Sequence, residues 1–188
     1  MRLCFIGSGI ERETTDVQDI EVTAIAKVVR TRYDTLVFGG SSIGLMGAFA
    51  TAFSSCGGRI IAVVPEWLEQ EGLTFPANET VRCRDLAERK RAMFESAQAV
   101  LCYPGGIGTC DELFDLLART AVDPSGASSW PCPPIYLYNW EKYYSALLLQ
   151  IEIGVEIGLI HSKSVEMIRA FESVESLSEL IDAENRVA

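Results

Sequence analysis

The protein has 188 residues, of which 48% are apolar and 22% are charged, and its formal net charge is −10. This length predicts a single domain, spanning residues 1–188, with a core large enough to fold alone. The acidic excess, without a basic stripe, argues against nucleic acid or an anionic membrane surface as a partner, and no apolar stretch is long enough for a transmembrane helix.

In the first half of the chain, short apolar runs alternate with helical patterns. Strands are predicted at 3–6, 36–38, 59–65 and 80–83, and helices at 16–30 and 45–56. The segment 66–79 has neither pattern and is expected to be a surface loop. Asp85 is expected to cap a further helix, which runs to about Ala97 and places Leu86, Met93 and Phe94 on its inner face.

The same alternation continues in the second half. Strands are predicted at 99–102, 135–138 and 165–171, and an amphipathic helix at 144–155. Residues 123–133 are rich in Pro, Ser and Gly and are expected to form an exposed loop, while Ser176-Leu177-Ser178-Glu179 indicates a capping box that opens a short C-terminal helix. Strands that alternate with helices predict an α/β fold: a Rossmann-like, doubly wound parallel sheet with helices on both faces.

The six cysteines form no C-x-x-C pair, and the chain has a single histidine. Zinc-ligand spacing is therefore absent, and we expect no metal. Cys4 and Cys102 fall inside predicted strands, where a thiol usually serves as a small core residue. Free thiols and the absence of a long apolar N-terminal run indicate a cytoplasmic protein.

Glycine-rich turns follow three of the predicted strands, at the strand ends where parallel sheets bind ligands. The first, Gly7-Ser8-Gly9, begins like a dinucleotide fingerprint but has Arg12 where the third glycine belongs, so a binding role and a plain connection are equally supported. The second spans 39–47 and places Gly44 and Gly47 in the first turns of a helix, where glycine is unfavourable. Either a ligand or tight helix packing would explain them.

The third turn spans 103–112 and reads Y-P-G-G-I-G-T-C-D-E between a strand and a helix. Glycines allow close approach of a ligand and helix N-termini attract anions, so the turn predicts a phosphate site with a carboxylate beside it. Thr109-x-x-Glu112 also matches a capping box, in which Glu112 would only reach back to the Thr109 amide. Arg89 lies near the buried face of its helix and would need an anion there, either a phosphate or Glu112, unless it snorkels to solvent.

Three motifs in this order resemble one known family, the "lonely guy" (LOG) family. They are Pro104-Gly105-Gly106-x-Gly108-Thr109-x-x-Glu112, Glu88-Arg89-Lys90-x-x-Met93 and the G-G-S-S-I-G-L-M-G turn at 39–47. LOG proteins are cytokinin riboside 5′-monophosphate phosphoribohydrolases, often mislabelled lysine decarboxylases. The resemblance implies a homodimer that hydrolyses the N-glycosidic bond of a nucleoside 5′-monophosphate, without a cofactor, to free base and ribose 5-phosphate. It implies Glu112 and Arg89 as catalytic residues, and phosphate or ribose binding by Ser8, Gly39, Gly40, Ser41, Gly44, Gly105, Gly106, Gly108 and Thr109.

Departures from the family pattern leave the base open. Ala87 stands where the family often has histidine, Gly7-Ser8-Gly9 replaces G-S-S, and the 123–133 loop is longer than usual. The base could be adenine or a cytokinin, or a pyrimidine as in CMP. A protein of a different class, a non-catalytic carrier of a nucleotide or of the molybdenum cofactor, is the remaining alternative. No feature marks a Schiff-base lysine, so the decarboxylase label is not supported.

Overall fold

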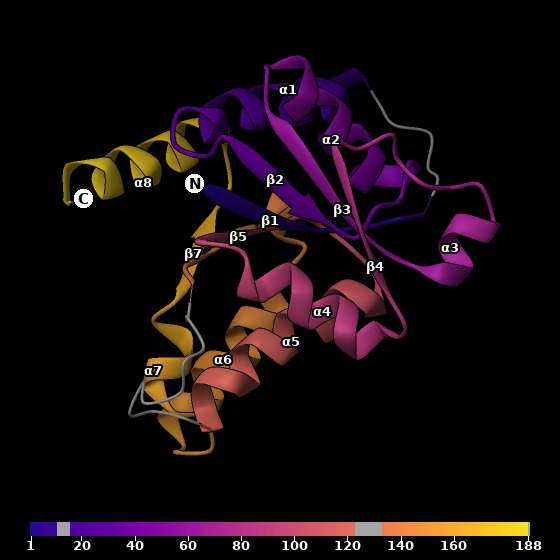
Figure 1. Ribbon diagram of the computed structural model, residues 1–188. Helices are drawn as coiled ribbons and strands as arrows, with labels where there is room; N and C mark the ends of the chain where they lie inside the picture. The colour runs from indigo at the N-terminus through magenta and orange to yellow at the C-terminus, as the bar shows by residue number, and fades with distance from the viewer. Residues whose placement is uncertain (11–15, 123–132, 188) are drawn as a thin grey trace.

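A computed structural model of the protein describes residues 1–10, 16–122 and 133–187 (Figure 1). The predicted loop at 123–133 lies outside these residues except for its last position. Seven strands pair in parallel in a single sheet with the order β4-β3-β2-β1-β5-β6-β7, which confirms the predicted fold class. The strands are β1 (Arg2–Ile6), β2 (Thr35–Phe38), β3 (Arg59–Pro65), β4 (Glu79–Cys83), β5 (Ala99–Cys102), β6 (Ile135–Tyr138) and β7 (Ile168–Phe171).

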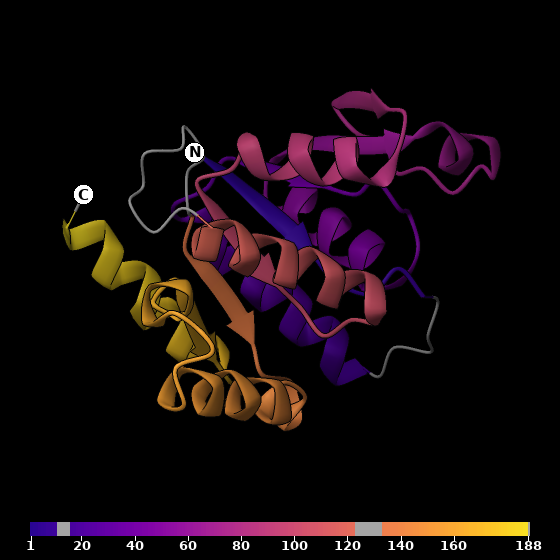
Figure 2. The ribbon, with the colours of Figure 1, turned by 90° about the horizontal axis from the view of Figure 1, so that it is seen from below.

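Helices cover both faces of the sheet (Figures 1 and 2). On one face lie α1 (Asp16–Arg30), α2 (Gly44–Ser55) and α8 (Val174–Val187); on the other lie α4 (Leu86–Glu95), α5 (Ile107–Val122), α6 (Ser145–Glu156) and α7 (Ser162–Val165). The side chains of a strand alternate between two buried clusters: Leu3 and Phe5 pack under α1 and α2, while Cys4 and Ile6 pack under α4 and α5. None of the described helices is long and apolar enough to cross a membrane.

Two predicted elements differ at their boundaries. The last strand begins at Ile168 rather than at residue 165, because α7 occupies the preceding residues. The C-terminal helix begins at Val174 and is longer than expected. Its cap is Ser173, whose hydroxyl accepts the Ser176 amide at 3.2 Å while the Ser176 hydroxyl accepts the Ser173 amide at 3.1 Å. The reciprocal pairing of a capping box is present, but it starts three residues earlier than the pattern suggested.

The segment 66–79 is more ordered than the predicted surface loop. It contains the short helix α3 (Glu66–Gln70) and then runs past the second glycine turn. Ser42 donates its amide and its hydroxyl to the Leu73 carbonyl at 2.8 and 2.9 Å, and the Phe75 amide donates to the Gly40 carbonyl at 2.8 Å. The segment therefore supports the glycine turn that follows β2.

The strand order reverses direction at β1, whose neighbours are β2 and β5. Chain segments leaving β1 and β5 consequently depart to opposite faces and open a crevice at the carboxyl ends of these strands. Ligands of doubly wound sheets bind at such a switch point. The first and third glycine turns follow these two strands, so the topology brings both turns to this place.

Candidate active site

The three glycine turns are joined to one another through main-chain atoms. The Ser8 amide donates to the Pro104 carbonyl at 3.3 Å, and the Met46 amide donates to the Ser8 carbonyl at 3.1 Å. Gly44 has a φ of +64°, and a Cβ at this position would lie 2.8 Å from the Ser8 carbonyl oxygen. The three turns thus form a single unit at the carboxyl edge of the sheet, and the first turn is part of it.

Packing accounts for the glycines of the second turn. Gly40 has a φ of +82° and Gly47 leaves no room for a side chain, since its Cβ would lie 2.0 Å from the Ser42 carbonyl oxygen. Gly44 presses against the first turn as described above. The tight-packing explanation therefore applies to these positions, and Ser41 beside them is buried, with its hydroxyl accepting the Ile43 amide at 3.3 Å.

Gly106 and Gly108 are different, because the fold does not require them to be glycine. A Cβ at either position would meet no heavy atom within 4 Å, and neither has a left-handed backbone. Ile107 between them is 87% exposed and begins α5, so the first amides of this helix face open space without partners inside the helix. The arrangement leaves room for a ligand to approach the main chain, and a helix N-terminus suits an anion.

Glu112 and Arg89 meet beside this turn. Glu112 is 8% exposed, and its Oε1 lies 3.4 Å from Nη1 of Arg89, whose side chain is 16% exposed. Burial raises the pKa of the Glu112 carboxyl from its ordinary 4.5 to about 7, although the Arg89 charge opposes this rise. The pair is longer than a strong charge-assisted hydrogen bond, and the buried Nε of Arg89 has no hydrogen-bond partner among the described residues. Arg89 therefore keeps one buried donor that no described residue satisfies.

The capping box proposed for Thr109 and Glu112 does not form. Because α5 begins at Ile107, Thr109 is the third residue inside the helix and cannot be its cap. Thr109 is instead buried against Gly105, where a Cβ would lie 2.1 Å from its hydroxyl oxygen. Glu112 is left to face Arg89.

Arg89 reaches Glu112 across the second glycine turn. A Cβ added to Gly39 would lie 1.5 Å from Nη2 of Arg89, so the guanidinium rests directly on the Gly39 main chain. The prediction that Arg89 lies near the buried face of α4 is confirmed, and Met93 is fully buried, but Leu86 is 54% exposed. Leu86 is the first residue of the helix and extends beyond the packed part of the sheet, which is why helical spacing alone placed it wrongly.

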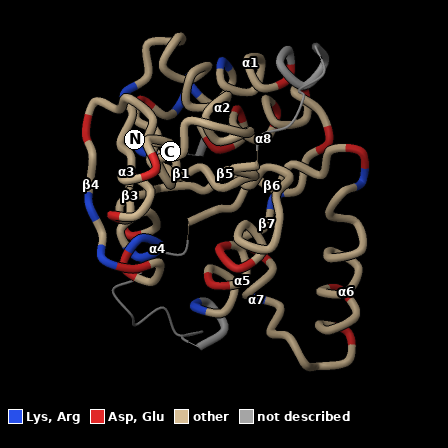
Figure 3. Tube along the Cα trace, turned by 90° about the vertical axis from the view of Figure 1, so that its right-hand side faces the viewer, with Lys and Arg blue, Asp and Glu red and all other residues tan. Residues whose placement is uncertain are grey.

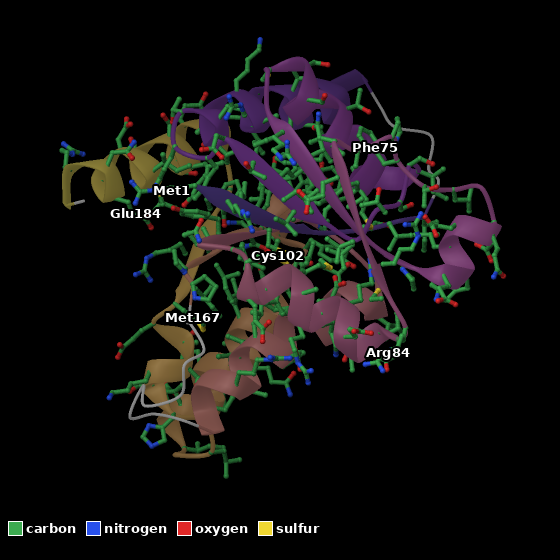
Figure 4. All side chains as sticks on the ribbon, in the orientation of Figure 1. Met1, Phe75, Arg84, Cys102, Met167 and Glu184 are labelled. Carbon is green, nitrogen blue, oxygen red and sulfur yellow. The ribbon has the colours of Figure 1, made fainter. Side chains whose placement is uncertain are left out.

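Charged and sulfur groups around this pair have structural partners. Lys90 is paired with Asp111 at 2.9 Å and with Asp115 at 3.9 Å, so it offers no free amine for a Schiff base; Figure 3 shows basic and acidic residues together on α4. Cys102, at the centre of the molecule in Figure 4, and Cys4 are fully buried, as expected of core thiols. Burial raises the pKa of the Cys102 thiol to about 12, with the nearby Glu112 charge adding to the rise.

Two tyrosines near the site were not singled out from the sequence as site residues. The Tyr143 hydroxyl donates to the Gly105 carbonyl at 2.7 Å, and the Tyr144 hydroxyl donates to the Tyr103 carbonyl at 2.8 Å. Both follow η1 (Trp140–Lys142) at the carboxyl end of β6. Their position after a strand was a usable signal, since any loop at this edge can reach the glycine turns.

Fold and site together define a Rossmann-like α/β protein with an open glycine turn and a buried Glu–Arg pair at the topological switch point. Residues 46–181 match a family model described as "Possible lysine decarboxylase". The chain is 31% identical over its full length, and over 86% of the relative, to the cytokinin riboside 5′-monophosphate phosphoribohydrolase LOG3 of Arabidopsis thaliana. It is 32% identical, again over its full length and over 88% of the relative, to the probable cytokinin riboside 5′-monophosphate phosphoribohydrolase LOGL3 of Oryza sativa subsp. japonica. The chain belongs to this LOG-type family.

Solved structures of another group share the fold. A Moco carrier protein from Chlamydomonas reinhardtii superposes with a TM-score of 0.68 at 15% identity, covering 100% of this chain and 98% of that one. A molybdenum cofactor binding protein from the phototrophic bacterium Rippkaea orientalis gives a TM-score of 0.64 at 16% identity, covering 97% and 94%. At this identity the similarity establishes the architecture and nothing about the ligand.

Proposed function

We propose that the protein hydrolyses the N-glycosidic bond of a nucleoside 5′-monophosphate and releases the free base and ribose 5-phosphate. The observation that carries the proposal is the buried Glu112–Arg89 pair beside a glycine turn that the fold leaves open. The phosphoribohydrolase names of the full-length relatives support the same reaction class.

In this proposal the 5′-phosphate binds the open main chain at Gly106 and Gly108, next to Ser8 and Thr109. Phosphate binding away from the reacting bond positions the ribose. The other proposed binding residues of the second turn, Gly39, Gly40, Ser41 and Gly44, shape the wall that carries Arg89.

The Glu112 carboxylate acts on the ribose. As the C1′–N bond breaks, its electron pair leaves with the base and positive charge develops at C1′, which a nearby carboxylate stabilises. A water oxygen bonds to C1′ and loses a proton to Glu112, from which the proton can pass to the departing base. Arg89 holds the carboxylate in place, so each step uses groups of this chain and water.

Base release from a panel of AMP, isopentenyl-AMP, CMP, UMP and GMP, followed by chromatography, tests the reaction and the base together. Glu112→Gln and Arg89→Ala are expected to abolish release while the protein remains folded by circular dichroism. Glu179→Gln, which removes an exposed carboxylate from α8, is the control and should keep wild-type turnover. Turnover near the wild-type rate in Glu112→Gln or Arg89→Ala would refute the mechanism. Preference for CMP or UMP would favour the pyrimidine alternative over the adenine or cytokinin type.

A non-catalytic carrier is the second candidate, favoured by the shared architecture of the Moco carrier proteins. A carrier would bind its ligand tightly and return it unchanged. Nucleotide recovered intact after prolonged incubation with a stoichiometric amount of protein would favour this class. The buried carboxylate beside an anion site argues for the enzyme, since it repels a bound phosphate and contributes nothing to carriage.

We also propose that the protein is a homodimer that pairs through α6. This helix and the turn after it expose Leu149, Ile153, Ile157 and Leu159, next to a groove of about 420 Å³ between α5, α6 and α7. A contiguous apolar surface of this kind marks an interface. Light scattering after size exclusion should give twice the chain mass of 20.6 kDa for the wild type. Trp67→Asp, at an exposed position on α3, is the control and should also give the dimer mass. Ile153→Asp should give the mass of a single chain. A monomeric wild type would refute the pairing.

A further inference from the structure

The turn at the end of β6 has a strained backbone. Glu141 and Lys142 have φ values of +45° and +64°, in the left-handed region that residues with a Cβ rarely adopt. Two such residues in succession persist only where the surroundings hold them, and strain of this kind is common at functional sites. The residues that follow the turn are Tyr143 and Tyr144, whose hydroxyls bond to the third glycine turn.

Glu172, just after β7, contacts the strained turn. Its carboxylate accepts Nζ of Lys142 at 2.6 Å and Nδ2 of Asn139 at 3.3 Å. The buried Asn139 in turn accepts the Tyr144 amide through its Oδ1 at 2.8 Å. The ends of β6 and β7 are thus tied together, and the tie includes the main chain of Tyr144, directly after Tyr143.

Three consecutive carbonyls of the glycine turn accept hydrogen bonds. The Tyr103 carbonyl accepts from the Tyr144 hydroxyl, the Pro104 carbonyl from the Ser8 amide, and the Gly105 carbonyl from the Tyr143 hydroxyl. The Gly105 carbonyl is the most consequential of the three, because it belongs to the peptide group that joins Gly105 to Gly106. Glycine has access to most of backbone space, so this peptide could otherwise rotate at little cost.

We propose that Tyr143 is a positioning residue for phosphate binding: its hydroxyl fixes the Gly105–Gly106 peptide so that the Gly106 amide is presented to the substrate phosphate. The described peptides contain no cis bond, and in a trans peptide the carbonyl and the amide hydrogen point in opposite directions. Holding the Gly105 carbonyl towards Tyr143 therefore directs the Gly106 amide away from it, at the position where the chain leaves open space. The inference rests on the proposed function for the identity of the ligand.

Tyr143→Phe tests this directly, because it removes one oxygen and keeps the ring. The expected result is a KM for the preferred nucleoside 5′-monophosphate raised about tenfold, a kcat within about twofold of wild type, and unchanged inhibition by the same nucleoside without phosphate. Tyr33→Phe is the matched control. The Tyr33 hydroxyl lies 3.2 Å from the Tyr136 hydroxyl, which also bonds to Glu184 of α8, and loss of the Tyr33 hydroxyl should leave KM unchanged. Equal weakening of nucleotide and nucleoside, or no change in KM, overturns the proposal.

A second pair of variants separates positioning from a general loss of stability. Lys142→Ala removes the bond to Glu172 and keeps a Cβ in the left-handed conformation, whereas Lys142→Gly removes the same bond but can adopt that conformation freely. KM should therefore rise more in Lys142→Ala than in Lys142→Gly, and equal values would contradict the link from the strained turn to the phosphate site.

Calorimetric titration with ribose 5-phosphate distinguishes failure of this inference from failure of the proposed function. If the wild type releases no base from any nucleotide, the proposed reaction is wrong. The positioning role is still supported in that case if Tyr143→Phe binds ribose 5-phosphate more weakly than Tyr33→Phe does. If the wild type binds neither ribose 5-phosphate nor any nucleotide of the panel, both are overturned.

Discussion

The buried carboxylate of Glu112 should make the wild-type protein lose stability as the pH rises, and Glu112→Gln should remove that loss. Burial raises the pKa of this group from 4.5 to about 7 in the folded state. The folded protein therefore holds a proton that the unfolded chain has already released between these two values. The stabilising contribution of the protonated form is fully present below about pH 4.5 and is lost as the pH rises through about 7.

The size of the effect follows from the two pKa values. At about 1.4 kcal/mol per pH unit, the free energy of unfolding should fall by about 2.5 kcal/mol between pH 5 and pH 8 through this group alone. A glutamine resembles the protonated acid and cannot ionise, so the variant lacks this decline. For a domain of this size, each kcal/mol corresponds to roughly 2–4 °C in Tm. The Tm of Glu112→Gln relative to wild type should therefore rise by roughly 5–10 °C between pH 5 and pH 8.

Thermal melts by circular dichroism at pH 5, 6, 7 and 8 in phosphate-free buffers measure the difference. Phosphate is omitted because a ligand that binds only the folded state raises Tm by itself. Glu179→Gln, which removes an exposed carboxylate from α8, sets the baseline for loss of a surface charge. A Tm difference between Glu112→Gln and wild type that is the same at pH 5 and pH 8 would show that Glu112 ionises as an ordinary surface group.

Three further predictions concern the site. First, kcat/KM for base release should rise about tenfold per pH unit below about 7 and level off above it, because Glu112 acts as the carboxylate; a flat profile from pH 5 to 8 would contradict that role. Second, Gly39→Ala should lower kcat/KM about 100-fold while Tm shifts by only a few degrees, because the new Cβ, 1.5 Å from Nη2 of Arg89, displaces a flexible side chain; unchanged kinetics would show that the guanidinium is not needed where it lies. Third, Gly106→Ala should keep the wild-type Tm and raise KM for the nucleotide, whereas Gly105→Ala should lower Tm; the reverse pattern would contradict the division between open and packed glycines.

The periodicity of the chain was sufficient for the fold class, because buried strands and amphipathic helices have distinct and regular signatures. The sequence also pointed to the turn at 103–112 and to Arg89, since glycines at strand ends and a cation near an apolar face are local features. The order of the strands is not local. It places β1 between β2 and β5, and so brings Ser8 to the site, which the first turn alone indicated only weakly.

The turn before Tyr143 shows what local patterns cannot convey. Left-handed backbone is normally signalled by glycine or asparagine, and here it is adopted by Glu141 and Lys142. Its contacts include Glu172, thirty residues further along the chain than Lys142. Such a conformation is decided by tertiary contacts. The place of the two tyrosines after a strand was a sequence signal, but their hydrogen bonds to the glycine turn could not be predicted from it.

The glycine turns touch one another through main-chain atoms, and this has a consequence for how the protein can diversify. A contact between an amide and a carbonyl is indifferent to the side chains that the two residues carry. Ile10 and Ile107, which belong to the first and third turns, are exposed, and the main-chain bonds between the turns use neither side chain. Substitutions at these positions should therefore leave the contacts between the turns intact. Under the proposed function, a library randomised at these codons is a place to look for altered base preference without rebuilding the site.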